Sequence, residues 1–442
     1  MTSVGATSNP SAQRLEWFLR DRFGLFIHWG LYSQPARGSG DRVHGGLAEW
    51  VRHNERLTDA DYRRFFDHFD PDLYDPAAWA QAAKAAGMRY AVLTTKHHDG
   101  FCLWDSQLTD YKATNTPAGR DLVRPWVDAF RAAGLRVGFY HSLIDWHHPD
   151  FPVDGLHPQR DDEAFRAQEQ GRDMARYRAY LHGQVRELLT GYGPIDLLWF
   201  DFSYPDRDWG WSRGKGKDDW GAEELVAMAR ALQPSILVNN RAETDPDFYT
   251  PEQVQPRAWL EIDGRRVPWE ACQTLNGSWG YDRDNLDWKS PDLLARMLVD
   301  TVSKGGNLIL NVGPTARGEF DPRALATLQP IGAWTRLHGR AIYGAGESAY
   351  TAPPDCRLTQ RGDRLYLHLF AWPLRHVSLD GLAGRVAYAQ FLHDGSEVRL
   401  LDGLRTNDYT APTGLDGQTL TLELPVQRPD VLVPVVELFL RE

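Results

Sequence analysis

Short apolar segments recur along residues 20–315, and most of them are continuous rather than alternating with polar residues. They are FGLFIHWG (Phe23–Gly30), YAVLTTKHHDG (Tyr90–Gly100), LRVGFYHS (Leu135–Ser142), IDLLWFDF (Ile195–Phe202), SILVNNR (Ser235–Arg241), VPWEACQTL (Val267–Leu275) and NLILNVGP (Asn307–Pro314). Continuous apolar runs are typical of strands buried on both faces, as in a parallel sheet. The pattern therefore predicts at least seven parallel strands.

Segments with helical periodicity separate several of these strands. They are Asp75–Ala86, Leu122–Ala133, Arg172–Leu189, Glu223–Leu232 and Pro291–Ser303. Gly87 and Gly134 follow two of these helices and are typical C-terminal caps. Strands that alternate with helices indicate parallel strands joined by crossover helices.

Polar residues end or follow nearly every apolar run: His28, His97, His98, Tyr140, His141, Asp201, Arg241 and Asn311. A (β/α)8 barrel builds its active site at the carboxyl ends of all its strands, whereas an open doubly wound sheet gathers ligands at one crevice. The distribution favours an irregular (β/α)8 barrel over residues 1–340, with one strand irregular or not recognised.

The pattern changes after Ala341. Short β-rich segments follow, namely Arg364–Pro373, Gly384–His393, Leu420–Leu424 and Asp430–Glu442, with Asp-Gly pairs at 380–381, 394–395, 402–403 and 416–417. Asp-Gly between strand-like segments is a hairpin signal. We therefore expect an antiparallel β-sandwich over residues 341–442.

Composition narrows the class of protein. The chain has 442 residues with 49 basic and 60 acidic side chains, a net charge of −11, and no basic run longer than two residues. A nucleic-acid or anionic membrane partner is not expected, because both need a basic face. Three distant cysteines form no disulfide framework or zinc motif. Met1–Gln13 lacks a signal-peptide pattern, and no apolar stretch is long enough to span a membrane. We therefore expect a cytoplasmic protein. Self-association into a homo-oligomer is left open.

Carboxylates are the first candidates for chemistry. Asp201 ends the run Leu-Leu-Trp-Phe, where a carboxylate needs partners or a role. Glycoside hydrolysis needs a second carboxyl group, and the spacing alone leaves Glu252, Glu261 and Glu270 open. Glu252 follows Pro251 in a predicted loop, whereas Glu270 adjoins a predicted strand beside Trp269.

The histidines near the strand ends suggest a metal site as an alternative. However, the chain has no HExxH motif, and adjacent histidines such as His97 and His98 point in opposite directions on a strand. Neutral imidazoles also bind sugar hydroxyls, which applies to His28, His97, His98 and His141. Several tryptophans lie close to the strand-end motifs, among them Trp50 and Trp279, and aromatic faces stack on the C–H faces of sugars.

Nine motifs together resemble the α-L-fucosidases of glycoside hydrolase family 29, from Phe23 to about Gly318. They are FGLFIHWGLYS, AEWV, YAVLTTKHHDGFCLWDS, GLRVGFYHS followed by DW, LLWFD, VNNR, YTPEQ, PWEACQTLNGSWGY and SKGGNLILNVGPTARG. The resemblance implies a retaining double displacement without metal or cofactor. It places the nucleophile on Asp201. Its sugar-binding positions fall on His28, Glu49, Trp50, His97, His98, Tyr140 and Arg241.

The acid/base is less uniform among relatives. The TPE pattern falls on Glu252 and the WE pattern on Glu270, and we favour Glu252 with Glu270 as the alternative. Many relatives have glycine after the nucleophile, where this chain has Phe202 and Ser203, and the polar loop Tyr204–Trp220 is also unusual. Both features concern the side of the site that takes the leaving group.

The function predicted from the sequence is therefore a retaining exo-α-L-fucosidase that acts on a fucosylated glycan or glycoside. Three alternatives remain: a related α-L-glycosidase such as an α-L-galactosidase, a barrel metallohydrolase, and a catalytically silent carbohydrate-binding protein. L-Fucose has three ring hydroxyls and a C5 methyl group, so its site needs several hydrogen-bonding groups and an apolar wall.

Overall fold

All seven predicted strands are present in the computed structural model, which describes residues 10–38, 47–167, 171–402 and 416–441. They form one parallel sheet in the order β5-β4-β3-β2-β1-β9-β8. Their bounds are β1 Phe23–Ile27, β2 Tyr90–Lys96, β3 Arg136–Ser142, β4 Leu197–Asp201, β5 Leu237–Val238, β8 Glu270–Thr274 and β9 Asn307–Val312. The polar residues noted at the ends of the apolar runs lie in the last part of a strand, as Tyr140 and Asp201 do, or directly after it, as His28 does.

The missing eighth position of the barrel is an irregular segment, residues 248–252. Phe248 bridges to Asn239 just beyond β5, while Tyr249 and Glu252 bridge to Trp269 and Cys272 at β8. These isolated parallel bridges join the two edges of the seven-stranded sheet and close the ring. The segment was expected as a loop because its run FYTPEQ contains a proline and is too short to show strand periodicity.

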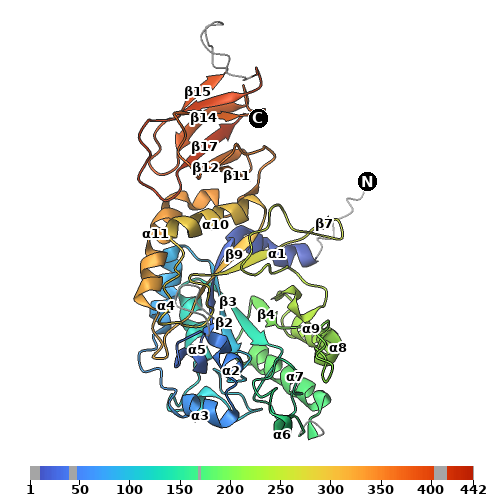
Figure 1. The fold of residues 1–442 in the computed structure, drawn as a ribbon. Helices are drawn as coiled ribbons and strands as arrows, with labels where there is room; N and C mark the ends of the chain where they lie inside the picture. The colour runs from blue at the N-terminus through green and yellow to red at the C-terminus, as the bar shows by residue number, and fades with distance from the viewer. Residues whose placement is uncertain (1–9, 39–46, 168–170, 403–415, 442) are drawn as a thin grey trace.

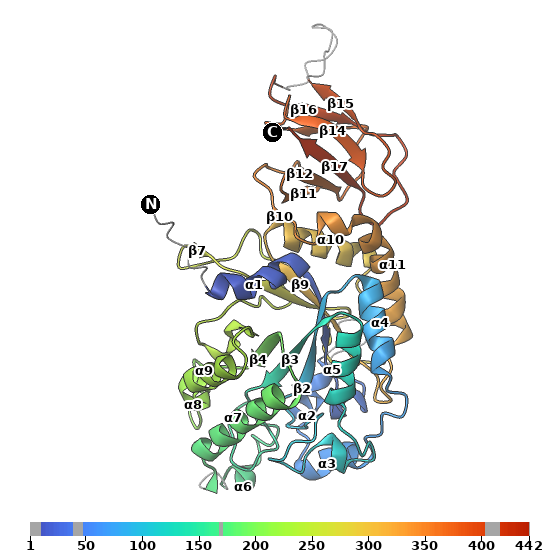
Figure 2. The same cartoon turned by 180° about the vertical axis from the view of Figure 1, so that it is seen from behind.

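Helices cover the outer face of the sheet (Figure 1, Figure 2). The five predicted helices are confirmed as α4 Pro76–Ala86, α5 Val123–Ala132, α7 Met174–Gly191, α9 Ala222–Leu232 and α10 Pro291–Ser303. The others are α1 Pro10–Asp21, α2 Val51–Asn54, α3 Asp59–Asp67, α6 Glu163–Arg166, α8 Lys217–Trp220 and α11 Pro322–His338. Gly87 has φ +93° at the end of α4, a left-handed conformation that explains glycine there. Among the described residues no helix is long and apolar enough to cross a membrane.

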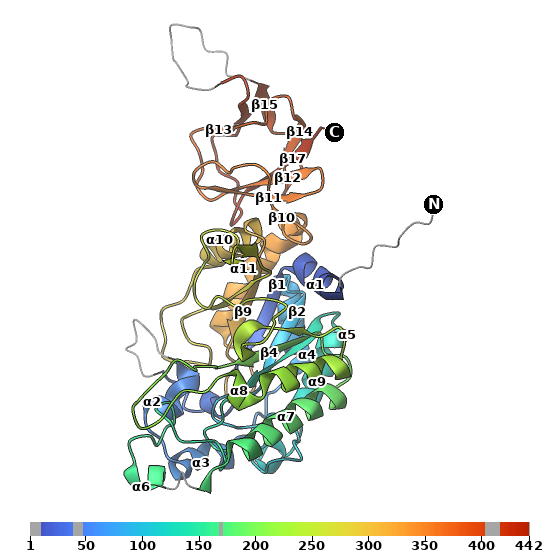
Figure 3. The same ribbon diagram turned by 90° about the vertical axis from the view of Figure 1, so that its right-hand side faces the viewer.

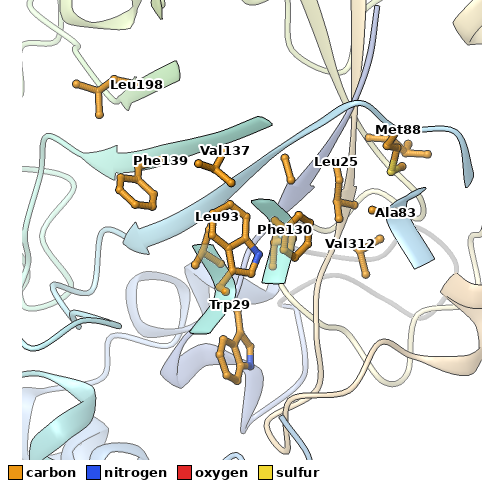
Figure 4. Packing of buried hydrophobic residues seen from close by; sticks show 14 of the residues in the cluster. Leu25, Trp29, Ala83, Met88, Leu93, Phe130, Val137, Phe139, Leu198 and Val312 are labelled. Carbon is orange, nitrogen blue, oxygen red and sulfur yellow. The ribbon is translucent and has the colours of Figure 1, made fainter. Parts of the chain in front are cut away.

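Side chains alternate between two apolar environments along each strand. Leu25, Leu93 and Val137 point outward and pack against Ala83 of α4 and Phe130 of α5 (Figure 4). Their neighbours on the strands fill the barrel interior, as the separate cluster of Phe26, Val92, Tyr140, Leu197, Trp199 and Ile309 shows. Two apolar faces explain why the strands read as continuous apolar runs. The same alternation decides which strand-end residues reach the site.

Helix α1 closes the amino-terminal end of the barrel, because Trp17 and Phe18 belong to the interior cluster with Tyr90 and Phe248. Of the segment Met1–Gln13, which was expected not to be a signal peptide, residues 1–9 lie outside the described residues. Helices α2 and α3 follow β1 and lie at the opposite end of the barrel, far from the C-terminal sheets (Figure 3). The site-bearing ends of the strands therefore face away from the C-terminal part.

Two antiparallel sheets are present in the C-terminal part, as far as the structure describes it. One has the order β10-β11-β12-β17-β14 and the other β13-β16-β15. Their bounds are β10 Gly346–Glu347, β11 Cys356–Arg361, β12 Arg364–Leu369, β13 His376–Leu379, β14 Val386–Phe391, β15 Arg399–Asp402, β16 Leu420–Glu423 and β17 Val435–Leu440. Side chains of both sheets share one hydrophobic cluster, so they pack as a sandwich, as predicted. The pair Asp402-Gly403 extends beyond the described residues, and the division at residue 341 stays a prediction, which this separate cluster favours.

Candidate active site

A small cavity of about 150 Å³ opens at the carboxyl ends of the barrel strands. Its lining residues come from seven of the eight positions of the barrel, counting each strand together with the loop that follows it. They are Phe26, His28, Leu47, Glu49, Trp50, His97, His98, Tyr140, Trp199, Asp201, Phe202, Arg241, Glu252 and Trp279. Ten of the twelve residues predicted from the sequence meet here, and two, His141 and Glu270, do not.

Asp201 ends β4 and points into the barrel, because Leu197 and Trp199 on the same strand also point inward. Its two oxygens have different partners. Oδ2 accepts a hydrogen bond from the Tyr140 hydroxyl at 2.8 Å, and Oδ1 accepts one from Nη1 of Arg241 at 2.8 Å. Two donors therefore fix the carboxylate, while 12% of the side chain remains accessible from the cavity.

Arg241 binds both candidate catalytic carboxylates. Its Nη2 lies 2.6 Å from Oε2 of Glu252, while its Nη1 holds Asp201, and its guanidinium carbon lies 4.5 Å from the centre of the Trp199 ring. Burial by itself lowers the pKa of Arg241, but the charges of Asp201 and Glu252 more than offset it and raise that pKa above its ordinary value. A planar guanidinium presents adjacent donors in a fixed fork, so it holds the two carboxylates close together.

Glu252 owes its position to the irregular eighth segment. Asn240 accepts hydrogen bonds from the backbone nitrogen and the hydroxyl of Thr250, at 3.0 and 2.9 Å, and Thr250 in turn accepts from Nε of Arg241. Bridging to Cys272 then fixes the backbone at Glu252 itself. The Glu252 side chain is 40% exposed, so it faces solvent as well as Arg241.

Three buried imidazoles supply neutral polar groups. Burial lowers the pKa of His28 to about 3 and holds the pKa values of His97 and His98 well below their ordinary value. His28 Nδ1 lies 2.7 Å from Oδ1 of Asn311, whose amide nitrogen donates to the Trp279 carbonyl. Because that amide oxygen can only accept, Nδ1 carries the proton and Nε2 of His28 is a hydrogen-bond acceptor.

His98 has the same tautomer for a similar reason. Its Nδ1 lies 2.7 Å from the Ser142 hydroxyl, which itself donates to the Ile144 carbonyl and therefore accepts from the imidazole. Nε2 of His98 is 3.8 Å from Oδ2 of Asp201. Two imidazole acceptors at the cavity surface are suited to the hydroxyl groups of a sugar.

The expectation that His97 and His98 point in opposite directions is wrong. Both line the cavity, with ring centres 4.0 Å apart. Strand β2 ends at Lys96 and its register shifts between Thr94 and Lys96, so the two histidines lie in a turn where strand alternation no longer holds. Within the part of the chain that the structure describes, no group of three or more His, Cys, Asp or Glu side chains is arranged to hold a metal ion.

Glu49 lies in a turn of 3₁₀ helix, Ala48–Trp50, over the cavity. One of its oxygens, Oε2, accepts from the Gly280 backbone nitrogen at 2.8 Å, whereas the buried Oε1 has no hydrogen-bond partner among the described residues. Burial raises the pKa of Glu49 to about 7. A buried oxygen without a partner is costly, which is the state expected of a group that awaits a ligand hydroxyl.

His141 is a correction to the sequence prediction. Tyr140 points inward, so the next side chain on β3 points outward, and His141 is fully buried between the sheet and the helices. Its Nδ1 lies 3.2 Å from the Thr95 hydroxyl, and it does not line the cavity. The residue packs the barrel wall instead of contacting a ligand.

Glu270 is also outside the cavity. It begins β8 at the amino-terminal end of the barrel interior and is fully buried. Its oxygens accept from the Tyr90 hydroxyl at 2.5 Å and from Nε1 of Trp199 at 3.2 Å, and burial raises its pKa to about 7. Trp199 thus separates Glu270 from the site. Glu261 lies on a short exposed hairpin of β6 (Glu261–Ile262) and β7 (Arg265–Arg266), away from the cavity.

A second, larger groove of about 710 Å³ adjoins the cavity. The two share Asp201, Phe202, Arg241 and Glu252. The groove is lined further by Leu156, Ser203, Tyr204, Pro205, Asp206, Arg207, Asn240, Glu243 and Thr250. The polar loop after β4 therefore borders the site, as the sequence predicted. Asn311 and Thr250, which position His28 and Arg241, were not identified as functional, although Asn311 was noted as a strand-end residue.

The family model of α-L-fucosidase matches residues 4–340 of the chain. The chain belongs to the α-L-fucosidase family. It is 30% identical to tissue α-L-fucosidase of Bos taurus over 379 residues, which is 81% of this chain and 75% of that protein. The predicted family and enzyme class, a glycoside hydrolase, are confirmed.

Solved structures of α-L-fucosidases show the same fold. Isoenzyme 1 from Paenibacillus thiaminolyticus is 48% identical with a TM-score of 0.89, covering 98% of this chain and 100% of that one. A family 29 enzyme of Bacteroides thetaiotaomicron is 27% identical with a TM-score of 0.81 over 100% of this chain and 98% of its own. That structure is a trapped covalent intermediate with 2-fluoro-fucosyl fluoride, which points to a retaining mechanism in the family.

Proposed function

We propose that this protein is a retaining exo-α-L-fucosidase in which Asp201 is the nucleophile and Glu252 the acid/base. The observation that carries the proposal is the pair of hydrogen bonds from Arg241 to both carboxylates, 2.8 Å to Asp201 and 2.6 Å to Glu252. Retaining enzymes hold their two carboxyl groups about 5–5.5 Å apart. One guanidinium fork that binds both groups supports a separation of this kind.

The cavity supports cleavage at a chain end. Its volume of about 150 Å³ suits a single small sugar, and below it the barrel is filled by Phe26, Trp199 and the buried Glu270. A glycan therefore has room to continue only toward the outer groove of 710 Å³. Asp201 and Glu252 lie where the two spaces meet, which is where the glycosidic bond of a terminal residue would lie.

The reaction proceeds in two displacements. Asp201 attacks the anomeric carbon while Glu252 protonates the departing glycosidic oxygen, and a covalent glycosyl–enzyme forms. Glu252 then removes a proton from water, which attacks the anomeric carbon and releases Asp201 with net retention. The hydrogen bonds from Tyr140 and Arg241 hold the Asp201 oxygens in place for both steps.

The remaining cavity residues bind the sugar in this proposal. His28, His97 and His98 are neutral because burial lowers their pKa values. Glu49 offers a buried oxygen that has no partner among the described residues, so these four side chains suit ring hydroxyls. Aromatic faces of Trp50 and Trp279 suit the C–H groups and the C5 methyl group of fucose. Glu270 is not proposed as the acid/base, because the Trp199 ring separates it from the cavity.

A single assay separates the alternatives. We expect hydrolysis of an aryl α-L-fucoside, faster than that of the aryl α-L-galactoside, with the α-anomer of fucose formed first as observed by NMR. A chelator should leave the rate unchanged. Preference for the galactoside, initial formation of the β-anomer, or loss of activity with the chelator would contradict the proposal. The cytoplasmic location, the absence of cofactor, nucleic-acid and membrane partners, and the oligomeric state stay predictions.

A further inference from the structure

Phe202, directly after Asp201, has a backbone conformation that is uncommon for its residue type. Its φ is +84°, in the left-handed region that glycine adopts without cost. For a bulky residue this conformation is strained, by about 1–3 kcal/mol, and it persists only where surrounding contacts impose it. Strain of this kind is concentrated at functional sites, so the reason for a phenylalanine at this position is to be sought in what its ring contacts.

The Phe202 ring lies on the boundary between the sugar cavity and the outer groove. It borders both spaces. Its centre is 5.2 Å from that of Trp50 and 4.9 Å from that of His98 on the cavity side, and 5.4 Å from that of Tyr204 on the groove side. The ring is only half-buried, so part of it remains accessible to a ligand. This ring and Glu252 are two of the four residues that the two spaces share.

The loop that forms the far wall of the groove, residues 204–215, is fixed by a buried ion pair. Asp154 accepts from Nζ of Lys215 at 2.5 Å and from the Tyr204 hydroxyl at 2.7 Å, and all three side chains are buried. The backbone closes the loop with hydrogen bonds from Tyr204 to Lys215 and from Gly214 to Arg207. The groove is therefore a preformed surface whose shape does not depend on a ligand.

We propose that the outer groove is a subsite for a sugar leaving group, and that the first ring of this leaving group stacks on Phe202. This inference rests on the proposed function, because it takes Asp201 and Glu252 as the point of cleavage. A leaving group attached at the glycosidic oxygen has to pass Phe202, which adjoins both spaces beside Asp201.

The chemistry of the groove favours a sugar over an alkyl or lipid group. Beyond Phe202 and Tyr204, the groove is lined by acidic, basic and amide side chains, which can donate as well as accept hydrogen bonds. They are Asp206, Arg207, Asn240 and Glu243. One aromatic face surrounded by hydrogen-bonding groups matches a pyranose, which has an apolar C–H face and a polar edge. A long apolar chain would leave these polar groups desolvated without partners, at a cost.

The test compares two leaving groups in purified protein. α-L-Fucosyl fluoride carries no leaving-group ring, whereas an α-L-fucosyl disaccharide places its second sugar in the groove. For Phe202→Gly, which suits the positive φ, we expect the ratio of kcat/KM for disaccharide to kcat/KM for fluoride to fall about tenfold or more. Phe202→Tyr keeps the aromatic face and should restore most of the ratio. Tyr388→Ala, at an exposed tyrosine on β14 of the C-terminal part and outside both spaces, is the matched control and should leave the ratio unchanged.

Each outcome bears on the inference. An unchanged ratio in Phe202→Gly would overturn it, and so would an equal fall for both substrates, because Phe202 would then shape only the sugar cavity. Failure of Phe202→Tyr to restore the ratio would show that the aromatic face is not the determinant. If the wild-type protein hydrolyses neither substrate, the proposed function itself fails, and this result is distinct from a change in the ratio.

Discussion

The sugar cavity and the outer groove are adjacent, but they are built in different ways. Polar groups of the cavity come from the ends of separate barrel strands, as Asp201, Tyr140 and His98 do, and nearly all are buried and fixed by second partners. The groove instead depends mainly on the single loop after β4 and on the residues that follow β5. In the proposed function, the terminal sugar is therefore bound by groups of the barrel itself. The leaving group is bound mainly by loop residues, and loops tolerate change better than the elements that they connect.

The largest expected effect is the loss of the nucleophile. Asp201→Gly should lower kcat about 10³-fold or more while the protein stays folded, because the first displacement has lost its attacking oxygen. Added azide should restore part of the rate and give β-fucosyl azide, which NMR identifies. The matched control is Asp196→Asn at the other end of β4, where Asp196 binds Arg136 far from the cavity. Asp201→Gly activity above about a tenth of wild type, under ~1.4 kcal/mol of barrier, would contradict the assignment.

The second-largest effect is expected from removal of the acid/base, and its size should depend on the leaving group of the substrate, which occupies the groove. Glu252→Ala should slow disaccharides about 10²–10⁴-fold, because their leaving group needs a proton. A dinitrophenyl fucoside, whose leaving group needs none, should be slowed little in its first displacement. Azide should then give α-fucosyl azide. Steady-state and burst kinetics on both substrates measure this difference, and the same pattern at Glu270 with Glu252→Ala near wild type would reverse the assignment.

A substitution in the loop after β4 should affect the groove more than the cavity, and two substrates can distinguish these effects. A Cβ atom added at Gly214 would lie 1.8 Å from the Tyr204 carbonyl oxygen, so the groove wall has to move in Gly214→Ala. We expect kcat/KM for the disaccharide to fall roughly tenfold, since small displacements of positioning groups cost this much or more. Hydrolysis of fucosyl fluoride should fall less. Gly191→Ala, where an added Cβ meets nothing within 4 Å, is the control. Equal losses on both substrates would mean that the loop also supports the cavity.

The smallest effect on activity is expected at Glu270. Glu270→Gln keeps acceptors and donors for Tyr90 and Trp199, so kcat/KM should change less than about tenfold. Its effect should appear in stability. The pKa of Glu270 is raised to about 7, so the folded protein binds its proton more tightly than the unfolded chain does. Its contribution to stability is therefore complete below about pH 4.5 and is lost as the pH rises toward 7.

Thermal unfolding from pH 4.5 to 7 measures this contribution. We expect the Tm of the wild-type protein to fall across this range more steeply than that of Glu270→Gln. The slope should not vanish, because the pKa of Glu49 is also raised to about 7. Parallel curves for the two proteins would show that folding does not raise the pKa of Glu270, which would contradict this account.

The barrel could be predicted from sequence because each strand lies between two apolar layers, which gives a continuous apolar run. Segment 248–252 could not, because it pairs through isolated bridges and contains Pro251. Helix α1 was missed because it begins within the polar segment Met1–Gln13, and only the folded structure shows that Trp17 and Phe18 pack in the barrel interior. His141 was wrongly assigned to the site because adjacent residues on a strand point to opposite faces. The sequence alone does not show that Tyr140, and not His141, points inward.

Most of the residues predicted for the site line the cavity, and they could be named from the sequence because they end apolar runs and match motifs of a known family. The sequence already favoured Glu252 over Glu270 as the proposed acid/base, and the fold adds an argument that the sequence does not contain, namely the Trp199 ring between Glu270 and the cavity. The conformation of Phe202 also has no sequence signal beyond the absence of a glycine. Backbone strain and the sharing of Arg241 by two carboxylates are properties of the folded chain alone.

Trapping of the covalent intermediate tests the central claim most directly. The protein is incubated with 2-fluoro-fucosyl fluoride, whose fluorine slows the second displacement, and the intact mass and the labelled peptide are measured by mass spectrometry. We predict one 2-fluoro-fucosyl adduct per chain, carried by the Asp201 side chain, and no adduct in Asp201→Gly. A label on another residue, or hydrolysis of natural fucosides that proceeds with inversion and without any adduct, would contradict the account.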